Sequence, residues 1–407
     1  MLHAVLVAPL FQANTLRYVR ALCDIPGVTP SVITQDSVDR LPDDLQRNLA
    51  RCVRVGNCMD TPQLIKACKQ LATDIGPVDR LIGALEQLQV PLAEARDACD
   101  IYGMRTQTAI NFRDKDRMKT VLREAGVPCA RHRLIESDTD ALDFIQTIGL
   151  PIILKPTDGL GSRGTFRIRN DDDLKAALKA LRPSLERPLQ AEEFVTGKEN
   201  TFETVTIDGV PQWHSGTHYL PGPLEVLENP WMQYCVLLPR EENLPEFTAF
   251  TDTNTRALTA LGMQTGLSHM EWFLREDGSA CVSEVGARPP GVHIMPMMSY
   301  VNDADFVRLW LRLMTLGQWP KLQRHCAAGV ACLRGQGRGG RVKAVHGLQQ
   351  AQEEVGRYVV DRAIPRVGQP KADGYEGEGF AIVVAEDTAT VKQALKRLVS
   401  LVRIELG

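Results

Sequence analysis

The chain has 407 residues, of which 44% are hydrophobic and 24% are charged, and its formal net charge at pH 7 is −3. A chain of this length is expected to fold into roughly two to four domains, each with its own core. A charge this close to zero gives no reason to expect a nucleic-acid partner. No apolar run reaches the roughly 20 residues that would cross a bilayer, so no membrane segment is expected.

The sequence also indicates a cytoplasmic protein. Residues 1–10 carry neither a basic segment nor a small-residue cleavage pattern, so no secretion signal is expected. Ten cysteines are scattered from Cys23 to Cys332 without a Cys-x-x-Cys pair. In a reducing compartment such cysteines are expected in the core rather than in disulfides or metal sites.

The N-terminal quarter alternates between strand and helix patterns, as an open parallel sheet would. A strand is predicted over 4–8, an amphipathic helix over 15–23 and another strand over 30–34. No Gly-x-Gly-x-x-Gly run follows the first strand, so no dinucleotide site is predicted here. Glu86 follows a later strand, at the edge where such sheets bind ligands. It is interpreted either as a substrate contact or as a carboxylate that favours a helix start.

Two helices are predicted next, over 115–125 and over 138–148, and a glycine follows each. Lys115 lies at the start of the first helix, where a cation opposes the helix dipole. Either an anion faces Lys115, or it is an ordinary surface lysine. Arg117 and Lys119, on the same helix, are expected to be solvated.

A glycine-rich loop joins two predicted strands, 151–156 and 166–169. Glycines let bare backbone N–H groups approach phosphate oxygens, and Lys155 at the end of the first strand would add a positive charge. The loop lacks the Gly-Lys-Ser/Thr ending and the directly following helix of a Walker loop. A plain hairpin tip is the alternative interpretation.

Residues 190–199 are predicted to form a short strand that enters a turn, with more acids than a buried strand would carry. Such a linker can offer backbone N–H and C=O groups to an adenine edge, while an acidic side chain holds ribose hydroxyls. Further along, residues 213–223 combine aromatic and imidazole side chains. These side chains suit a pocket that selects the acceptor substrate, although the paired histidines can equally be core or surface groups.

The most informative pattern is a predicted hairpin of strands 268–275 and 280–288. If the Asp-Gly pair at its tip forms a two-residue loop, Glu271 faces Glu284. Opposed Cβ atoms lie roughly 5 Å apart, where two unit charges repel by about 3 kcal/mol at an effective dielectric near 20. A hard divalent ion would relieve this repulsion. The alternative is an exposed hairpin that tolerates its facing acids.

Two more residues of the hairpin are candidates for the chemistry. Arg288 comes four residues after Glu284 and would add a fixed cation. His269 shares a strand face with Glu271, so it would contact phosphate or donate to an acyl oxygen. Metal ligation by His269 is less favoured, because Mg²⁺ prefers oxygen ligands.

The tail contains a misleading motif. Residues 335–340 match Gly-x-Gly-x-x-Gly, but a strand pattern follows instead of a helix, so a glycine-rich hairpin is predicted. The last element, over 388–402, has one apolar face and is expected to be a docked helix.

Taken in order, these motifs resemble the ATP-grasp superfamily over about half the chain. Within it, the chain looks most like the amino-acid ligases that make dipeptides, with a nucleotide domain similar to those of carbamoyl-phosphate synthetase and biotin carboxylase. The resemblance implies an α/β fold. An open parallel-sheet domain (1–112) would precede the small lobe (113–190) and the large lobe (191–320), and a small α+β domain (321–407) would follow.

The resemblance also implies ATP as the nucleotide and Mg²⁺ as the metal, with Mn²⁺ as an alternative. It assigns Glu271 and Glu284 to the metal, and Arg288, Lys155 and His269 to catalysis. One departure is Gly286, where many members carry Asn, which puts a second metal ion in doubt. The residues it assigns to the nucleotide are Lys115, Lys155, Gly161, Ser162, Gly164, Glu192, Glu193, Phe194, Val195 and Glu199.

The implied activity joins a carboxylate to an amine at the expense of ATP, through an acyl phosphate, with release of ADP and phosphate. The implied partners are small molecules, most similar to amino acids, and neither nucleic acid nor membrane. The identity of both substrates and the oligomeric state stay open, with a homodimer as one candidate. Two alternatives remain: a biotin-carboxylase-like enzyme that uses carboxyphosphate, and a non-catalytic nucleotide-binding protein.

Overall fold

The computed structural model describes residues 1–157, 164–229, 232–374 and 376–407. Its N-terminal part is a parallel sheet in the order β3-β2-β1-β4, which confirms the predicted alternation of strands and helices. β1 pairs with β2 on one side and with β4 on the other, so the order of the strands reverses between β1 and β4. The elements of this part are β1 (Leu2–Val7), α1 (Ala13–Cys23), β2 (Val28–Thr34), α2 (Asp43–Asn48), β3 (Arg51–Arg54), α3 (Thr61–Asp74), β4 (Arg80–Ile82), α4 (Gln89–Cys99) and α5 (Thr106–Arg113).

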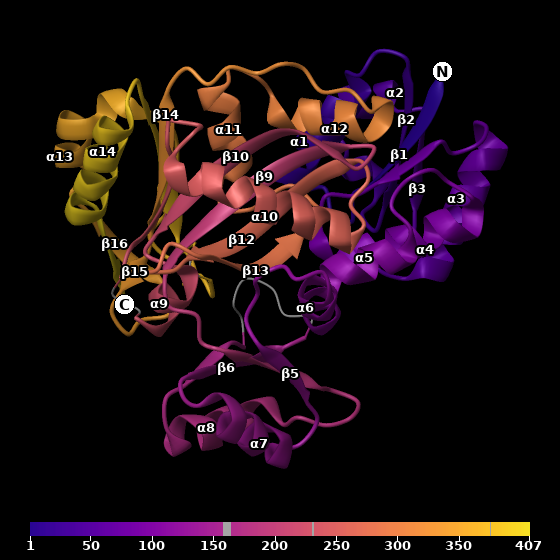
Figure 1. Cartoon of the computed structure of the whole chain (residues 1–407). Helices are drawn as coiled ribbons and strands as arrows, with labels where there is room; N and C mark the ends of the chain where they lie inside the picture. The colour runs from indigo at the N-terminus through magenta and orange to yellow at the C-terminus, as the bar shows by residue number, and fades with distance from the viewer. Residues whose placement is uncertain (158–163, 230–231, 375) are drawn as a thin grey trace.

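A second sheet is antiparallel, has the order β5-β8-β6-β7, and carries two helices that lie below it in Figure 1. The helix predicted over 138–148 is confirmed with the same bounds. Ser137 caps its first turn by accepting a hydrogen bond from the N–H of Asp140, and Gly149 (φ 85°) ends it. The elements of this lobe are β5 (His132–Ile135), α7 (Asp138–Ile148), β6 (Ile152–Pro156), β7 (Phe166–Ile168), α8 (Asp171–Leu181) and β8 (Leu189–Glu193).

The largest sheet has eight antiparallel strands in the order β13-β12-β9-β10-β11-β14-β18-β17. Because β11 pairs with β14, the domain boundary expected at residue 320 falls between two strands of one sheet. The division into four domains stays a prediction. The strands are β9 (Lys198–Ile207), β10 (Val210–Leu220), β11 (Tyr234–Leu238), β12 (Gly266–Leu274), β13 (Ala280–Gly286), β14 (Ala327–Leu333), β17 (Val359–Ala363) and β18 (Gly379–Ala385).

Apolar side chains on both faces of the large sheet form most of the core. On one face Phe202, Met270 and Trp272 pack against α10, and the Trp272 ring stacks on Phe250 with 4.0 Å between centroids. On the other face Val205 packs with α11, α12 and the N-terminal part of the chain. The remaining helices around the sheet are α6 (Lys115–Glu124), α9 (Pro223–Glu228), α10 (Pro245–Leu261), α11 (Ile294–Val301) and α12 (Phe306–Leu316).

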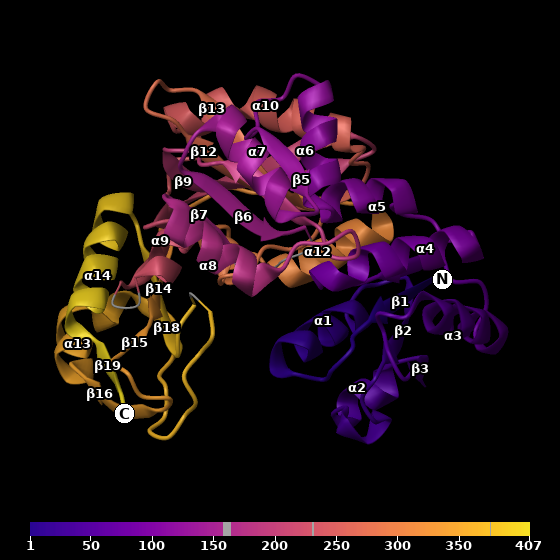
Figure 2. The same ribbon diagram turned by 90° about the horizontal axis from the view of Figure 1, so that it is seen from below.

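The C-terminal part adds a three-stranded sheet and two helices, at the left of Figure 2. The predicted docked helix is confirmed as α14 (Thr388–Leu401), whose Val391 and Leu395 pack on β14 at Gly329. The predicted glycine-rich hairpin is wrong. β15 (Gly335–Gln336) and β16 (Val342–His346) do not pair with each other, because β19 (Arg403–Leu406) lies between them. The other element here is α13 (Leu348–Val355).

The sequence predicted neither membrane-spanning segments nor disulfides. In the described part of the chain, no helix combines the length and the hydropathy needed to cross a membrane. The ten cysteines are all free thiols, and five of them are buried while five are partly exposed, so the expected core location holds for half of them.

Candidate active site

The hairpin β12–β13 places Glu271 directly opposite Glu284, as predicted. The turn that achieves this pairing is different from the expected one. Arg275 pairs with Ser279, which leaves a three-residue loop whose last residue, Gly278, has a φ of +80°. A bulge next to Glu271 then shifts the register by one residue, and the two carboxylates face each other after all.

One face of the large sheet carries the polar groups of the candidate site. Successive side chains of a strand point to opposite faces, so alternate residues of neighbouring strands meet. Glu203 of β9 lies opposite His269 of β12, and Thr201 lies opposite Glu271. The residues that share this face are Glu199, Thr201 and Glu203 on β9, His269, Glu271 and Phe273 on β12, and Glu284 on β13.

Two buried lysines of α6 face this carboxylate cluster. Lys115 is only 5% exposed, and its Nζ lies 2.5 Å from Oε1 of Glu284, so the surface-lysine interpretation is wrong. Lys119 was expected in solvent but is 1% exposed, because four residues along a helix it lies on the same side as Lys115. Its Nζ donates to the carbonyl of Ser283 at 3.0 Å.

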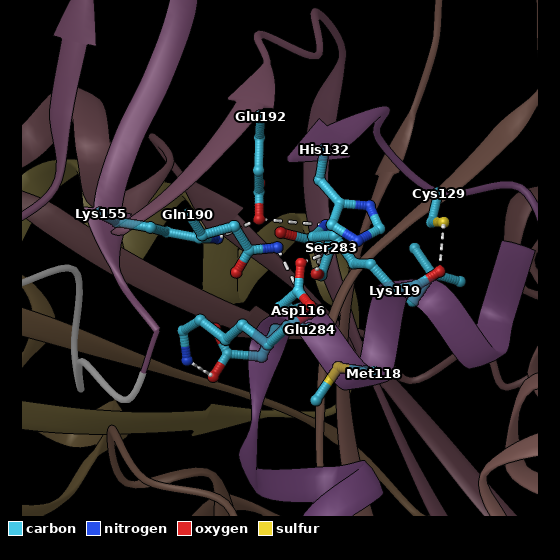
Figure 3. Close-up of polar contacts among 12 residues, drawn as sticks. Asp116, Met118, Lys119, Cys129, His132, Lys155, Gln190, Glu192, Ser283 and Glu284 are labelled. Atoms are coloured by element: carbon cyan, nitrogen blue, oxygen red, sulfur yellow. Dashed lines mark hydrogen bonds and ion pairs between the residues drawn. The ribbon is translucent and has the colours of Figure 1, made fainter. Parts of the chain in front are cut away.

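Glu192 joins the two lobes electrostatically. Its Oε1 lies 2.7 Å from Nζ of Lys155 and 3.4 Å from Nζ of Lys119, as Figure 3 shows. Burial lowers the pKa of Lys155, but Glu192 and Glu284 outweigh it and raise that pKa above its ordinary value. Lys155 is therefore protonated at neutral pH and provides a positive charge in the site.

Glu284 stays ionised for the same reason. Burial raises the pKa of its carboxyl group, whereas Lys115 and Lys155 lower it more strongly, to about 2. The neighbouring Glu199 behaves in the opposite way, since burial and the charge of Glu271 raise its pKa well above the ordinary value. The site thus combines one strongly acidic carboxylate with one that readily holds a proton.

His269 is held between two carboxylates. Its Nδ1 lies 2.8 Å from Oε1 of the fully buried Glu203, and its Nε2 lies 3.8 Å from Oε1 of Glu271. Burial lowers the pKa of His269, but Glu203 and Glu271 together raise it to about 9. The hydroxyl of Tyr219 donates to the same Glu271 oxygen at 3.0 Å. A protonated imidazole and a phenol therefore both orient Glu271.

Arg288 ties the hairpin to the N-terminal sheet. Its Nε donates to Oε2 of Glu86 at 2.6 Å, and its Nη1 donates to the carbonyl of Pro289. Glu86 does start a short helical turn, but it is also 7% exposed and directed into the site. The helix-start interpretation of Glu86 is therefore confirmed. Whether it contacts a substrate stays a prediction.

The residues that flank the glycine loop, Pro156 and Thr165, and the linker after β8 lie at the opposite end of the site. β6 and β7 pair antiparallel, which confirms a strand on each side of the loop. Gly161 and Ser162 lie outside the described residues. Gly164 has a φ of +71°, and a Cβ added to it would lie 3.3 Å from the ring of Pro156, so a larger residue would be strained there.

A single cavity of about 460 Å³ connects these groups. It runs from the end of β1 and the Glu86–Arg288 pair, past the two facing carboxylates, to the linker that follows β8. Gly164 does not line it, although its neighbour Thr165 does. The predicted residues that line the cavity are Lys115, Lys155, Glu192, Glu193, Phe194, Val195, Glu199, His269, Glu271, Glu284 and Arg288. Their individual roles stay predictions.

Few residues of the aromatic segment 213–223 line the cavity. The imidazoles of His214 and His218 stack on Phe202 and Phe247 in the core, and burial lowers the pKa of both. Only Tyr219, Pro223 and Leu224 of this segment and its continuation line the cavity, because Tyr219 lies on the opposite face of β10. The core interpretation therefore holds for both histidines.

Three residues of the site were not identified from the sequence. Lys119 shares a helix face with Lys115, and that spacing was a usable signal. Glu203 is a charged residue among the apolar and threonine residues of the second half of β9, 201–207, which is also unusual. Tyr219 belongs to the aromatic segment 213–223, which was a candidate pocket, but its contact with Glu271, 52 residues further along the chain, was not predicted.

The residues present suit a hard metal ion that shares its coordination with phosphate oxygens. Glu271 and Glu284 supply carboxylate oxygens from facing strands, and Gly286 adds no side-chain ligand. Among the described residues, no group of three or more His, Cys, Asp or Glu side chains would hold an ion alone. Mg²⁺ is commonly bound by one or two carboxylates together with nucleotide phosphates.

Comparison with known proteins agrees with this geometry. The family profile described as ATP-grasp domain matches residues 120–293. The chain contains an ATP-grasp domain. Its fold is also that of the L-amino acid ligase from Bacillus licheniformis, with a TM-score of 0.79, 19% sequence identity, and coverage of 100% of this chain and 99% of that one. The ATP-grasp fold and its α/β class are thus confirmed.

Two curated relatives match the ATP-grasp chain in part. The carbamoyl phosphate synthase large chain of Methanothermobacter thermautotrophicus is 27% identical over 234 residues, which is 56% of this chain and 21% of the synthase. The alanine–anticapsin ligase of Bacillus subtilis is 24% identical over 275 residues, which is 63% of this chain and 58% of the ligase. The chain thus spans about a fifth of the first relative and over half of the second.

Proposed function

We propose that this ATP-grasp protein is an ATP-dependent carboxylate–amine ligase that forms an amide bond and releases ADP and phosphate. The observation that carries the proposal is the convergence of Lys115, Lys155 and Arg288 on Glu271 and Glu284 in one cavity. Two of the similar proteins support it, because the Bacillus subtilis relative and the Bacillus licheniformis structure are both named as ligases of amino acids.

The nucleotide would enter from the small lobe. Residues 192–195 and Phe273 line that end of the cavity and would receive the adenine, while Glu199 would hold the ribose. Lys155 and Lys115 would bind the phosphates, as fixed cations in a partly buried site. Glu271 and Glu284 would hold a magnesium ion that neutralises phosphate charge. Manganese satisfies the same oxygen ligands.

The reaction needs no side-chain nucleophile. A carboxylate oxygen of the first substrate attacks the γ-phosphorus, and the bond to the β–γ bridging oxygen breaks to release ADP. The amine nitrogen of the second substrate then attacks the acyl carbon, the C–O bond to phosphate breaks, and the nitrogen loses a proton. Arg288 is placed to stabilise the transferring phosphoryl group or the acyl phosphate.

The substrates would bind at the edge of the N-terminal sheet. In open parallel sheets ligands bind beyond the carboxyl ends of the strands, where the strand order reverses. Here that point lies between β1 and β4, and Val7, Pro9 and Leu85 line the cavity beside it. Among the described lining residues from this part and from 286–292, Glu86 and Arg288 carry the only charges. Small amino acids and similar carboxylates suit a crevice of this size.

The test is a screen of ADP release over pairs of amino acids with Mg²⁺ and ATP. The proposal predicts release that requires both a carboxylate and an amine, with a new amide product found by mass spectrometry. Release that depends on bicarbonate and no amine would favour the carboxylase alternative. Tight ATP binding without turnover on any pair would favour a non-catalytic nucleotide-binding protein.

A further inference from the structure

A second cavity, of about 330 Å³, lies between the N-terminal sheet and the large sheet. It shares no lining residue with the active-site cavity. Its walls come from β4, α4 and the loop after it, the turn between β9 and β10, and the C-terminal end of α12. Two arginines, Arg80 and Arg96, line it.

Arg96 is a buried cation without an acidic partner in the described part of the chain. It is 4% exposed, and its guanidinium donates only to backbone carbonyls, to Leu81 through Nε and Nη2 and to Met104 through Nη1. Burial lowers the pKa of Arg96 to about 10, so it remains charged at neutral pH. Carbonyl dipoles solvate this charge but do not neutralise it.

Arg80 adds a second guanidinium group, for which the described residues provide no ion pair with an acidic side chain. Its Cζ lies 4.3 Å from the centroid of the Tyr102 ring, and its Nη1 donates to the carbonyl of Asp79. Its Nε is buried and has no hydrogen-bond partner among the described residues.

The nearby acids do not compensate these two charges. Asp97 pairs with Arg105 and accepts from Thr106, away from the cavity. Asp208 lines the cavity, but it is solvent-exposed and lies beside Thr265. With two arginines and one exposed acid, the lining keeps a net positive charge. The remaining wall is largely apolar and includes Ile207, Leu313, Met314 and Leu316.

We propose that this cavity is a binding site for a small oxyanion, a carboxylate or a phosphate, held by the guanidinium groups of Arg80 and Arg96. Planar guanidinium groups bind such oxygens through paired N–H donors. The site is independent of the ligase proposal, because none of its residues lines the cavity that holds the facing carboxylates.

The test measures thermal unfolding of the full chain in potassium sulfate against potassium chloride at equal ionic strength, with MgADP present to fill the nucleotide site. Sulfate at ten times its Kd should raise the folded-to-unfolded ratio about 11-fold in the wild type. Arg80→Met should reduce the sulfate effect to the smaller stabilisation that sulfate gives any folded protein through exclusion from its surface. The matched control Arg47→Met, at an exposed arginine of α2, should keep the full sulfate effect. A second series with acetate separates a carboxylate preference from a phosphate-like one.

Arg80→Lys provides a second variant in case Arg80→Met does not fold. It keeps the cation but loses the planar fork, so it should bind sulfate more weakly than the wild type. Selenate soaked into crystals would give anomalous density between the two arginines. Equal stabilisation by sulfate and chloride in the wild type, or an unchanged sulfate effect in Arg80→Met, would overturn the proposal.

Discussion

Nδ1 of His269 lies 2.8 Å from Oε1 of Glu203, and this contact joins an ordered imidazole to a carboxylate that no solvent reaches. The pair lies on the same sheet face as Glu271, one of the two proposed metal ligands. Glu203 does not itself line either cavity, so its influence on the site would act through His269, which does line the first cavity.

The first prediction concerns pH. The pKa of His269 is raised from 6.5 to about 9, so its contribution to stability is fully present below pH 6.5 and is lost as the pH rises through 9. This shift in pKa corresponds to a contribution of about 3 kcal/mol to the free energy of unfolding. Glu203→Gln removes the partner charge and should flatten this part of the profile. Urea unfolding of the wild type and of Glu203→Gln from pH 6 to pH 10 measures how the free energy of unfolding depends on pH. Parallel profiles would contradict the assignment.

The second prediction concerns the facing carboxylates. Glu284→Gln keeps the volume but removes a charge, and it should lower Mg²⁺-dependent turnover by more than about 100-fold, since even partners that only orient a metal ligand cost about 10–100-fold. The fold should survive. Glu276→Gln, in the exposed loop of the same hairpin, is the matched control and should leave turnover unchanged. Wild-type rates in Glu284→Gln would show that Glu284 is not a metal ligand.

Much of the site could be predicted because its residues belong to local patterns. The pairing of Glu271 with Glu284 follows from hairpin geometry, although the predicted two-residue turn was wrong. A bulge beside Glu271 compensated for the longer loop, and bulges leave no reliable trace in sequence. The helices over 138–148 and 388–402 were predicted well, because caps and apolar spacing are local signals.

Long-range contacts account for what was missed. Glu86 meets Arg288 across 202 residues, and Lys119 meets Ser283 across 164 residues. Neither contact follows from the spacing of residues within one element. The hairpin predicted in the C-terminal tail was wrong for the same reason. The strand β19, from the end of the chain, lies between β15 and β16 in the sheet. A single sequence carries no record of such pairings.

The third prediction concerns Lys119. Its Nζ donates to Ser283 and lies 3.4 Å from Glu192, beside the proposed phosphate ligand Lys155. Lys119→Met should raise the KM for ATP by about 10-fold or more, because hydrogen bonds of charged groups contribute about 1.5–3 kcal/mol. Lys175→Met, at an exposed position on α8, serves as the control. An unchanged KM in Lys119→Met would exclude a role for it in nucleotide binding.

The fourth prediction concerns Arg288 and the identity of the products. A fixed guanidinium at a transferring phosphoryl group can be worth about 10³-fold or more in rate. Arg288→Lys keeps the charge but loses the planar fork that contacts Glu86 through Nε. It should lower kcat by about 100-fold while the KM for ATP changes little, since a loss confined to the transition state spares ground-state binding.

Arg312→Lys, at an exposed position on α12, is the matched control for Arg288→Lys and should keep the wild-type kcat. The products should be ADP and phosphate in both proteins, because Lys155, Arg288 and the two carboxylates converge on the end of the triphosphate. An adenylating enzyme would instead need these charges at the α-phosphorus. Stoichiometric AMP with any substrate pair, or a near-normal kcat in Arg288→Lys, would contradict the acyl-phosphate mechanism.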